Sequence, residues 1–266
     1  MSSFSRPTIV LFPIVFCLFS GARALAASPP TSANVTTSRG DYSLHVYAPT
    51  KDRGRPLILL FSGEGGWRRF DHLLAGVFQE EGFWVGGMDC MEYFWKAQDD
   101  RLALASDVRA YAAALALTAG RAGESPLILA GFSFGADLVP WVAGGGGWGS
   151  RIAGLILLGP DEEGSLEFRV LEMLGFSQRE HVFPVSEALA SSRGIPVLFI
   201  HGGADRHSSA PRLARSAPSP KKLLAVPDAD HHFSGREPEL RRILMEGLDW
   251  LLRTASLPSV VSEGNP

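Results

Sequence analysis

The sequence predicts an α/β fold in which helices cover both faces of a mostly parallel sheet. Six short apolar runs lack polar alternation, and segments with helical spacing separate several of them. Strands buried on both faces read as such continuous runs, and strands that alternate with helices build a parallel sheet. A glycine-flanked turn directly after the third run marks a candidate site at one edge of that sheet.

The first 27 residues differ from the rest of the chain. An apolar stretch covers residues 9–19, and the small residues of GARALAAS follow it, which is the pattern of a secretory signal peptide. The alternative is a membrane anchor, but Pro13 and Arg23 leave an apolar run too short to span a bilayer. We therefore expect residues 1–27 to be a signal peptide that is removed on export.

The composition is that of a globular protein, with 45% hydrophobic and 20% charged residues in 266. Acidic residues outnumber basic ones, which argues against nucleic acid as a partner. Only Cys90 remains beyond the signal peptide, so no internal disulfide is expected. No C-x-x-C or H-E-x-x-H spacing occurs, and we expect neither a metal site nor a cofactor.

The remaining chain is predicted to form one domain over residues 39–256. Residues 28–38 are small, polar and proline-bearing, and we expect a flexible leader there, with a flexible tail over 257–266. The segment DYSLHVYAP alternates as a half-buried strand does. The six buried strands are predicted at residues 57–61, 83–88, 127–130, 152–158, 197–200 and 223–226.

Two segments are predicted to be helices. Residues 102–117 are rich in leucine and alanine, and residues 240–251 carry leucine and isoleucine along one side at helical spacing. The longest stretch without a clear strand runs from Asp161 to Gly194. An excursion of that length between two strands predicts a short lid-like insertion over a pocket.

The third apolar run leads directly into GFSFGADL, residues 131–138. A strand, a sharp turn and a helix form the context in which G-x-S-x-G presents a nucleophilic serine. Gly131 and Gly135 fit this context, because a tight turn leaves little room for side chains. We predict that Ser133 is a nucleophile rather than part of an ordinary turn.

Attack by a serine on an ester builds negative charge on the carbonyl oxygen, and backbone N–H groups stabilise it. One predicted donor is the N–H of Phe134, directly after the nucleophile. The first apolar run is followed by SGEGGW, residues 62–67, and this turn predicts the second donor at Gly63 or Glu64.

Two later loops offer the acid and the base of a catalytic triad. Asp205 lies a few residues after the run 197–200, where it can orient a histidine. The last loop, PDADHHFSG, contains two candidate bases, His231 and His232. In related loops the base precedes an aromatic residue by one or two positions; this favours His231 and leaves His232 as the alternative. The chain order serine, aspartate, histidine is that of α/β-hydrolases.

With these residues the chain resembles an α/β-hydrolase, and more narrowly the VirJ/AcvB family of bacterial virulence proteins. The resemblance covers about residues 40–255. It implies an exported periplasmic serine hydrolase that cleaves the aminoacyl ester of lysyl-phosphatidylglycerol at the membrane surface, linked to virulence and to secretion-system components. The motifs that carry it are FSGEGGW (61–67), MDCMEYFW (88–95), GFSFGAD (131–137), EFRVLEMLGF (167–176) and DADHHF (228–233).

Such a substrate presents ammonium groups near the ester. Asp89 and Asp161 follow predicted strands and would attract a cation, while Trp67 and Tyr93 would shield an apolar stem. Each also has an ordinary interpretation, since acids after strands often cap helices and aromatic residues there usually belong to the core. Two other functions stay open: a general carboxylesterase of the same fold, and a periplasmic accessory protein without catalysis.

Overall fold

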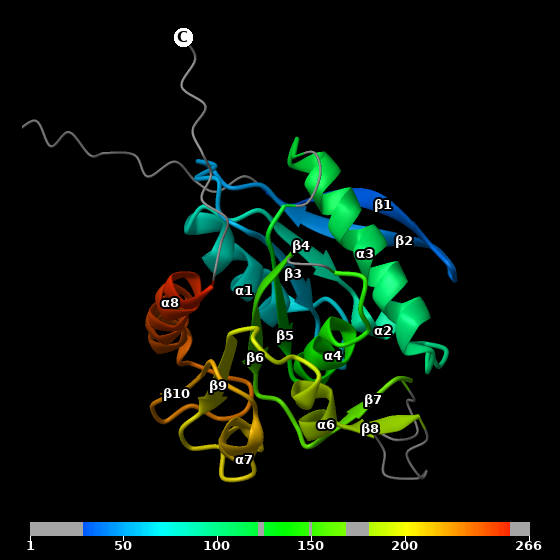
Figure 1. The fold of residues 1–266 in the computed structure, drawn as a ribbon. Coiled ribbons are helices and arrows are strands. Elements are labelled where there is room, and N and C mark those ends of the chain that lie inside the picture. Colours follow the sequence, from blue (N-terminus) through cyan, green and yellow to red (C-terminus); the bar gives the residue numbers. More distant parts are fainter. Residues whose placement is uncertain (1–28, 122–124, 149–150, 169–180, 256–266) are drawn as a thin grey trace, which may run out of the picture.

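The computed structural model describes residues 29–121, 125–148, 151–168 and 181–255. The predicted signal peptide and tail lie outside these residues. The described chain forms a sheet of eight strands in the order β1-β2-β4-β3-β5-β6-β9-β10 (Figure 1). In this order, the strands β4, β3, β5, β6, β9 and β10 run parallel to one another. Strand β2 is antiparallel to β4, and β1 is antiparallel to β2. Their bounds are β1 Thr31–Thr37, β2 Gly40–Tyr47, β3 Leu57–Phe61, β4 Val85–Met88, β5 Leu127–Phe132, β6 Ile152–Leu158, β9 Val197–Gly202 and β10 Lys221–Val226.

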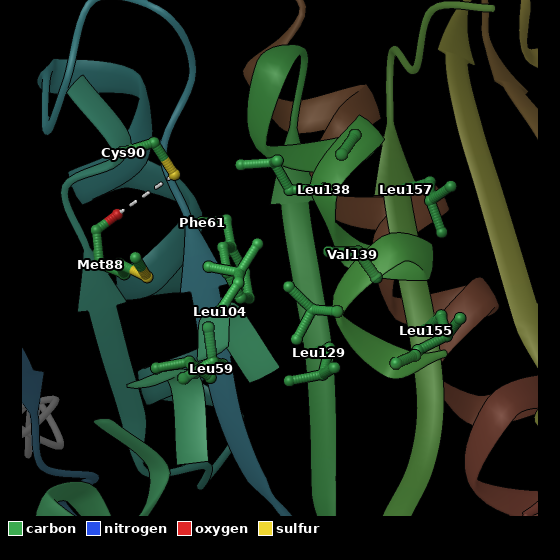
Figure 2. Packing of buried hydrophobic residues seen from close by; sticks show 14 of the residues in the cluster. Leu59, Phe61, Met88, Cys90, Leu104, Leu129, Leu138, Val139, Leu155 and Leu157 are labelled. Atoms are coloured by element: carbon green, nitrogen blue, oxygen red, sulfur yellow. Dashed lines mark hydrogen bonds between the residues drawn. The ribbon is translucent and has the colours of Figure 1, made fainter. Parts of the chain in front are cut away.

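Helices cover both faces of this sheet. Successive residues of β3 point to opposite sides: Leu59 packs in one hydrophobic cluster and Leu60 in the other. Figure 2 shows the first cluster, in which Leu59, Leu129 and Leu155 of three strands face α3 and α4. The two buried faces explain why the strands lack polar alternation, and the predicted α/β fold is confirmed. Helices α1 (Arg69–Glu80) and α8 (Glu237–Thr254) cover one face; α3 (Arg101–Thr118), α4 (Phe134–Ala143), α6 (Val185–Ala190) and α7 (Ala210–Ser216) cover the other.

The predicted flexible leader is wrong for residues 31–37, which form the edge strand β1. Val35 is its only fully buried side chain, and the others are wholly or partly exposed. Only Ala33 and Val35 of this strand pack against the core, which is too short an apolar alternation for sequence reading to detect. The hairpin turn after β1 is fixed to α3, because Ser38 donates hydrogen bonds from its N–H and its hydroxyl to Asp107, both at 2.8 Å.

A pair of substitutions in β1 tests this correction. Val35→Asp places a carboxylate in a buried position and should lower the free energy of unfolding by roughly 2–4 kcal/mol. Asn34→Asp adds the same group at the exposed neighbouring position and should change it by less than about 0.5 kcal/mol. Thermal melting of both variants measures the difference. Equal melting temperatures would support the prediction that these residues form a flexible leader.

The predicted insertion contains a small separate hairpin of β7 (Glu163–Ser165) and β8 (Val182–Pro184). Residues 169–180 lie outside the described part, so the lid remains a prediction. The described part of the insertion that ends at Phe168 packs beside the short helix α2 (Cys90–Tyr93). The N–H of Phe168 donates to the carbonyl oxygen of Phe94 at 2.7 Å. Among the described helices, none combines the length and apolar character needed to cross a membrane.

Candidate active site

Ser133 lies in a sharp turn between β5 and α4, at the carboxyl edge of the sheet. Its φ of 51° and ψ of −120° are unusual for a residue with a side chain. A side chain on Gly131 would lie 2.3 Å from the Gly135 carbonyl oxygen, and one on Gly135 would lie 2.4 Å from the Phe61 carbonyl oxygen. Both glycines are therefore required by backbone packing, and the turn pushes Ser133 outward.

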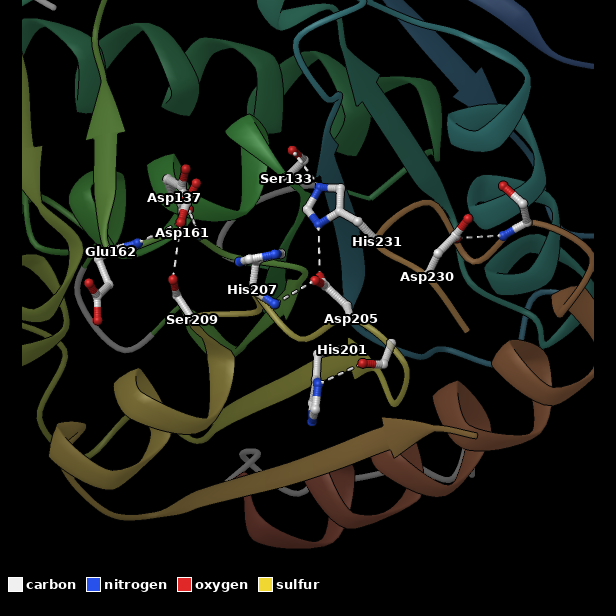
Figure 3. A network of polar contacts seen from close by, with 12 residues as sticks. Ser133, Asp137, Asp161, Glu162, His201, Asp205, His207, Ser209, Asp230 and His231 are labelled. Carbon is white, nitrogen blue, oxygen red and sulfur yellow. Dashed lines mark hydrogen bonds and ion pairs between the residues drawn. The ribbon is translucent and has the colours of Figure 1, made fainter. Parts of the chain in front are cut away.

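Three residues that are distant in sequence meet at this turn (Figure 3). The Ser133 hydroxyl lies 3.1 Å from Nε2 of His231, and Nδ1 of His231 lies 3.4 Å from Oδ2 of Asp205. With a proton on Nδ1, the imidazole donates to Asp205 and its Nε2 accepts from the serine hydroxyl. This is the arrangement of a nucleophile, a general base and an orienting acid.

The loops that carry the acid and the base are packed onto each other. The N–H of Ala204 donates to the carbonyl oxygen of Ala229 at 2.9 Å. A side chain on Gly202 would lie 2.3 Å from the Asp230 carbonyl oxygen, so glycine allows this approach. Phe233 is completely buried, and its ring stacks on Phe70 with a centroid separation of 5.8 Å. The aromatic residue thus anchors the loop, and His231 is held over the turn.

His232 does not join this chain of hydrogen bonds. Its side chain is exposed, and its ring packs edge-on against His231 at a centroid separation of 5.2 Å. The geometry therefore favours His231 over His232 as the base. His207, which lies in the acid loop, donates its backbone N–H to Oδ1 of Asp205 at 3.1 Å and lines a cavity that Asp205 and His231 also line.

The turn after β3 lies against the same site. A side chain on Gly63 would lie 3.1 Å from the Phe132 ring, which places this turn beside the serine turn. The N–H of Phe134 is at the first position of α4, where helical backbone donors have no partner within the helix. Glu64 is exposed on the turn. The structure thus brings all three predicted oxyanion residues to one edge.

One cavity adjoins the triad and a second lies beyond it, and Asp161 lines both. The smaller, about 240 Å³, is shared by His231, Asp205 and Asp161. The larger, about 630 Å³, extends along Glu162 and Glu163. Oδ1 of Asp161 accepts from the Ser209 hydroxyl at 3.0 Å, and Glu162 pairs with Arg212. Asp161 is therefore the predicted substrate-binding residue that reaches the triad cavity.

The structure corrects the predicted binding roles of Trp67 and Tyr93. Trp67 is buried over β4, and its Nε1 donates to the Tyr47 hydroxyl at 3.1 Å. Tyr93 is only 1% exposed and donates its hydroxyl proton to Asp107 at 2.6 Å. Burial and this hydrogen bond raise the pKa of Tyr93. These aromatic side chains belong to the core, which is the more common role of such residues.

Asp89 also has a structural role. Its carboxylate caps α2 by accepting from the N–H of Glu92 at 3.0 Å, and it accepts from the N–H of Trp67 at 3.0 Å. Asx residues commonly cap helices in this way. The carboxylate therefore joins two loops of the protein, and a direct contact with substrate is not supported.

Sequence reading missed two buried aspartates near the site. Oδ1 of Asp137 accepts from the N–H of Asp161 at 2.7 Å, which ties the cavity wall to α4. Asp71 lies under the turn after β3. The only sequence signal for either was an acid in the first turn of a helix, which normally predicts capping. Within the described ranges, no group of three or more histidine, cysteine or acidic residues is placed to hold a metal ion.

Comparisons with known proteins agree with this geometry. The sequence model of a family described as "Bacterial virulence protein (VirJ)" matches residues 56–251. No curated protein matches the chain. The fold is similar to that of the esterase domain of a Rhodothermus marinus protein, with a TM-score of 0.61, 17% identity, and 85% of this chain and 99% of that one covered.

Two further structures show the same likeness. One is a dienelactone hydrolase from Anabaena variabilis, with a TM-score of 0.61, 17% identity, and 84% of this chain and 97% of that one covered. The other is an α/β serine hydrolase without a lid from Xanthomonas campestris, with a TM-score of 0.56, 20% identity, and 87% and 97% covered. The fold is therefore that of the α/β-hydrolases.

Proposed function

We propose that this protein is a serine esterase. The chain belongs to the VirJ family of bacterial virulence proteins and has the α/β-hydrolase fold. The observation that carries this proposal is the alignment of Ser133, His231 and Asp205 at 3.1 Å and 3.4 Å on a strained turn. A residue held at positive φ costs free energy and persists where the surrounding structure enforces it, which is common at functional sites.

The geometry supports acyl transfer in two steps. Oγ of Ser133 forms a bond to the ester carbonyl carbon while Nε2 of His231 takes the hydroxyl proton, and the carbonyl electrons move onto its oxygen. When the carbonyl re-forms, the alcohol oxygen leaves with the proton from His231. Water then attacks the acyl-serine with the same histidine as base, which releases the acid and restores Ser133. Asp205 keeps the imidazole oriented throughout.

For the substrate, we propose an aminoacyl ester of a phospholipid, namely lysyl-phosphatidylglycerol. The α-ammonium of a lysyl ester is one carbon away from the reacting carbonyl, so its counter-charge must lie near Ser133. Asp161 is exposed and shares the small cavity with His231, which supports this assignment. The longer ε-ammonium arm fits the adjoining cavity, where Glu163 is also exposed.

A fluorophosphonate probe tests the esterase proposal on the purified protein. Covalent labelling at Ser133, located by mass spectrometry, is expected because the histidine activates this hydroxyl. Labelling of the folded protein at no serine would favour a binding or accessory function instead. Lipid extracts from cells with and without the gene then test the substrate, since unchanged lysyl-lipid levels would contradict it.

Replacement of the cavity carboxylate tests the recognition of the ammonium group. Asp161→Asn should lower kcat/KM for a lysyl ester by about tenfold, while a neutral acetyl ester loses little. The matched control is Asp230→Asn, an exposed carboxylate next to His231 in sequence that lines neither of the two cavities described above. Equal losses in both variants would mean that overall charge, and not Asp161, attracts the substrate.

We also propose that the protein works in the periplasm, where the lipid headgroup is accessible. Removal of the signal peptide at its predicted end places the first residue of the mature protein near Ser28, only a few residues before β1. Amino-terminal sequencing of the protein from the periplasmic fraction tests this. Recovery of full-length protein only from the cytoplasm would reject it.

A further inference from the structure

Two carboxylates hold the carboxyl end of the turn of residues 62–68. Oδ2 of Asp71, at the third position of α1, accepts from the N–H of Arg68 at 2.8 Å. Oδ2 of Asp89, the N-cap of α2, accepts from the N–H of Trp67 at 3.0 Å. These bonds fix two consecutive amides of the turn to two different helices.

The remaining amides of the turn divide into used and free donors. The N–H of Ser62 donates to the Met88 carbonyl at 3.1 Å, and that of Gly66 donates to Gly63 at 3.1 Å, closing a β-turn. Glu64 and Gly65, at the centre of this β-turn, are exposed, and in the described part of the chain their N–H groups have no hydrogen-bond partner.

The turn depends on glycine where it meets Asp89. Gly66 has a φ of 75°, and a side chain there would lie 2.9 Å from both carboxylate oxygens. A carboxylate this close to the backbone leaves no room for another residue type. The path of the turn and the position of Asp89 are therefore coupled.

Asp71 is unfavourably placed for a group that serves only as a helix cap. It is 3% exposed, and its Oδ1 is buried without a hydrogen-bond partner among the described residues. Burial raises its pKa to about 6, a nearby Asp89 adds to this rise, and the backbone N–H groups of Arg68 and Gly63 oppose it. A buried, partly unsatisfied carboxylate costs stability, so its presence requires a reason beyond packing.

The turn held in this way contacts the serine turn directly. A side chain on Gly135 would lie 2.6 Å from the Ser62 carbonyl oxygen, and one on Gly63 would lie 3.1 Å from the Phe132 ring. A shift of the turn would therefore displace its free amides relative to Ser133. Stabilisation of an oxyanion depends on donors that are fixed before the reaction.

On the premise of the proposed esterase, we infer that Asp71 and Asp89 are positioning residues that aim the free N–H groups of Glu64 and Gly65 at the oxyanion. The two carboxylates act on the turn and do not touch the substrate.

A comparison of a lysine alkyl ester with its thionoester tests this inference. Sulfur accepts hydrogen bonds weakly, so a well-placed oxyanion site favours the oxygen ester, and a displaced one loses that preference. Asp71→Asn should lower kcat for the oxygen ester by roughly 10- to 100-fold and leave KM nearly unchanged. This loss of kcat is smaller than the loss that follows deletion of an oxyanion donor. The ratio of oxygen-ester to thionoester rates should fall by about tenfold.

The control is Asp107→Asn, which alters an equally buried carboxylate, 3% exposed, that bonds to the β1–β2 turn. It should lower the melting temperature and leave the rate ratio unchanged. Asp89 is less buried than Asp71, so Asp89→Asn provides a second variant if Asp71→Asn does not fold. Lower kcat with an unchanged ratio in both variants would overturn the inference. A wild-type protein that cleaves neither ester and is not labelled by the fluorophosphonate probe would instead reject the esterase itself, and the inference with it.

Discussion

Ser133→Ala should reduce ester hydrolysis by at least about 10⁴-fold and leave thermal melting nearly unchanged. The variant removes the atom that attacks the carbonyl, while Ala keeps the same positive-φ turn at the same backbone cost. Ser133→Gly should be equally inactive but more stable by about 1 kcal/mol, because glycine tolerates a φ of 51°. Together the two variants separate the chemistry of the hydroxyl from the strain of the turn.

The matched control is Ser234→Ala, which removes an exposed hydroxyl from the loop of His231. Its kcat/KM and its fluorophosphonate labelling should equal those of the wild type. Activity in Ser133→Ala equal to that of the wild type would show that another group performs the reaction. A large loss of stability in Ser133→Ala would mean that the serine is a structural part of the turn.

The central sheet could be predicted because its strands satisfy one simple physical condition. Both faces of β3 and β5 are buried, so every position is apolar and the pattern persists through the whole strand. The edge strand β1 does not satisfy it: one face is exposed and only Val35 is buried. Its place depends on the hairpin pairing with β2 and on the bonds from Ser38 to Asp107, two residues that are distant in sequence.

The site could be predicted as far as its backbone topology determines it. Ser133, Asp205 and His231 follow strand ends, and parallel strands bring those ends to one edge. The roles of Trp67 and Asp89 depend on side-chain direction: the indole packs over Gly87, and the carboxylate turns back to backbone N–H groups. An acid after a strand reads the same in sequence whether it caps a helix or faces a ligand.

His231→Ala should lower kcat/KM by about 10⁴-fold, whereas His232→Ala should change it by no more than a few-fold. The two residues are adjacent and have the same side chain, so they form a matched pair. Only His231 lies within reach of the Ser133 hydroxyl, at 3.1 Å, while His232 packs its ring against Phe132 at a centroid separation of 6.3 Å. Steady-state kinetics with one soluble ester measures both.

A double variant shows which histidine acts together with the serine. Groups that perform one proton transfer are strongly non-additive, because losing either already abolishes the step. Ser133→Ala/His231→Ala should therefore be no slower than Ser133→Ala alone. In the wild-type background a large loss from His232→Ala, with little loss from His231→Ala, would reverse the assignment. Such a reversal would require the loop to shift its register by one residue. The buried ring of Phe233 anchors the loop and opposes this shift.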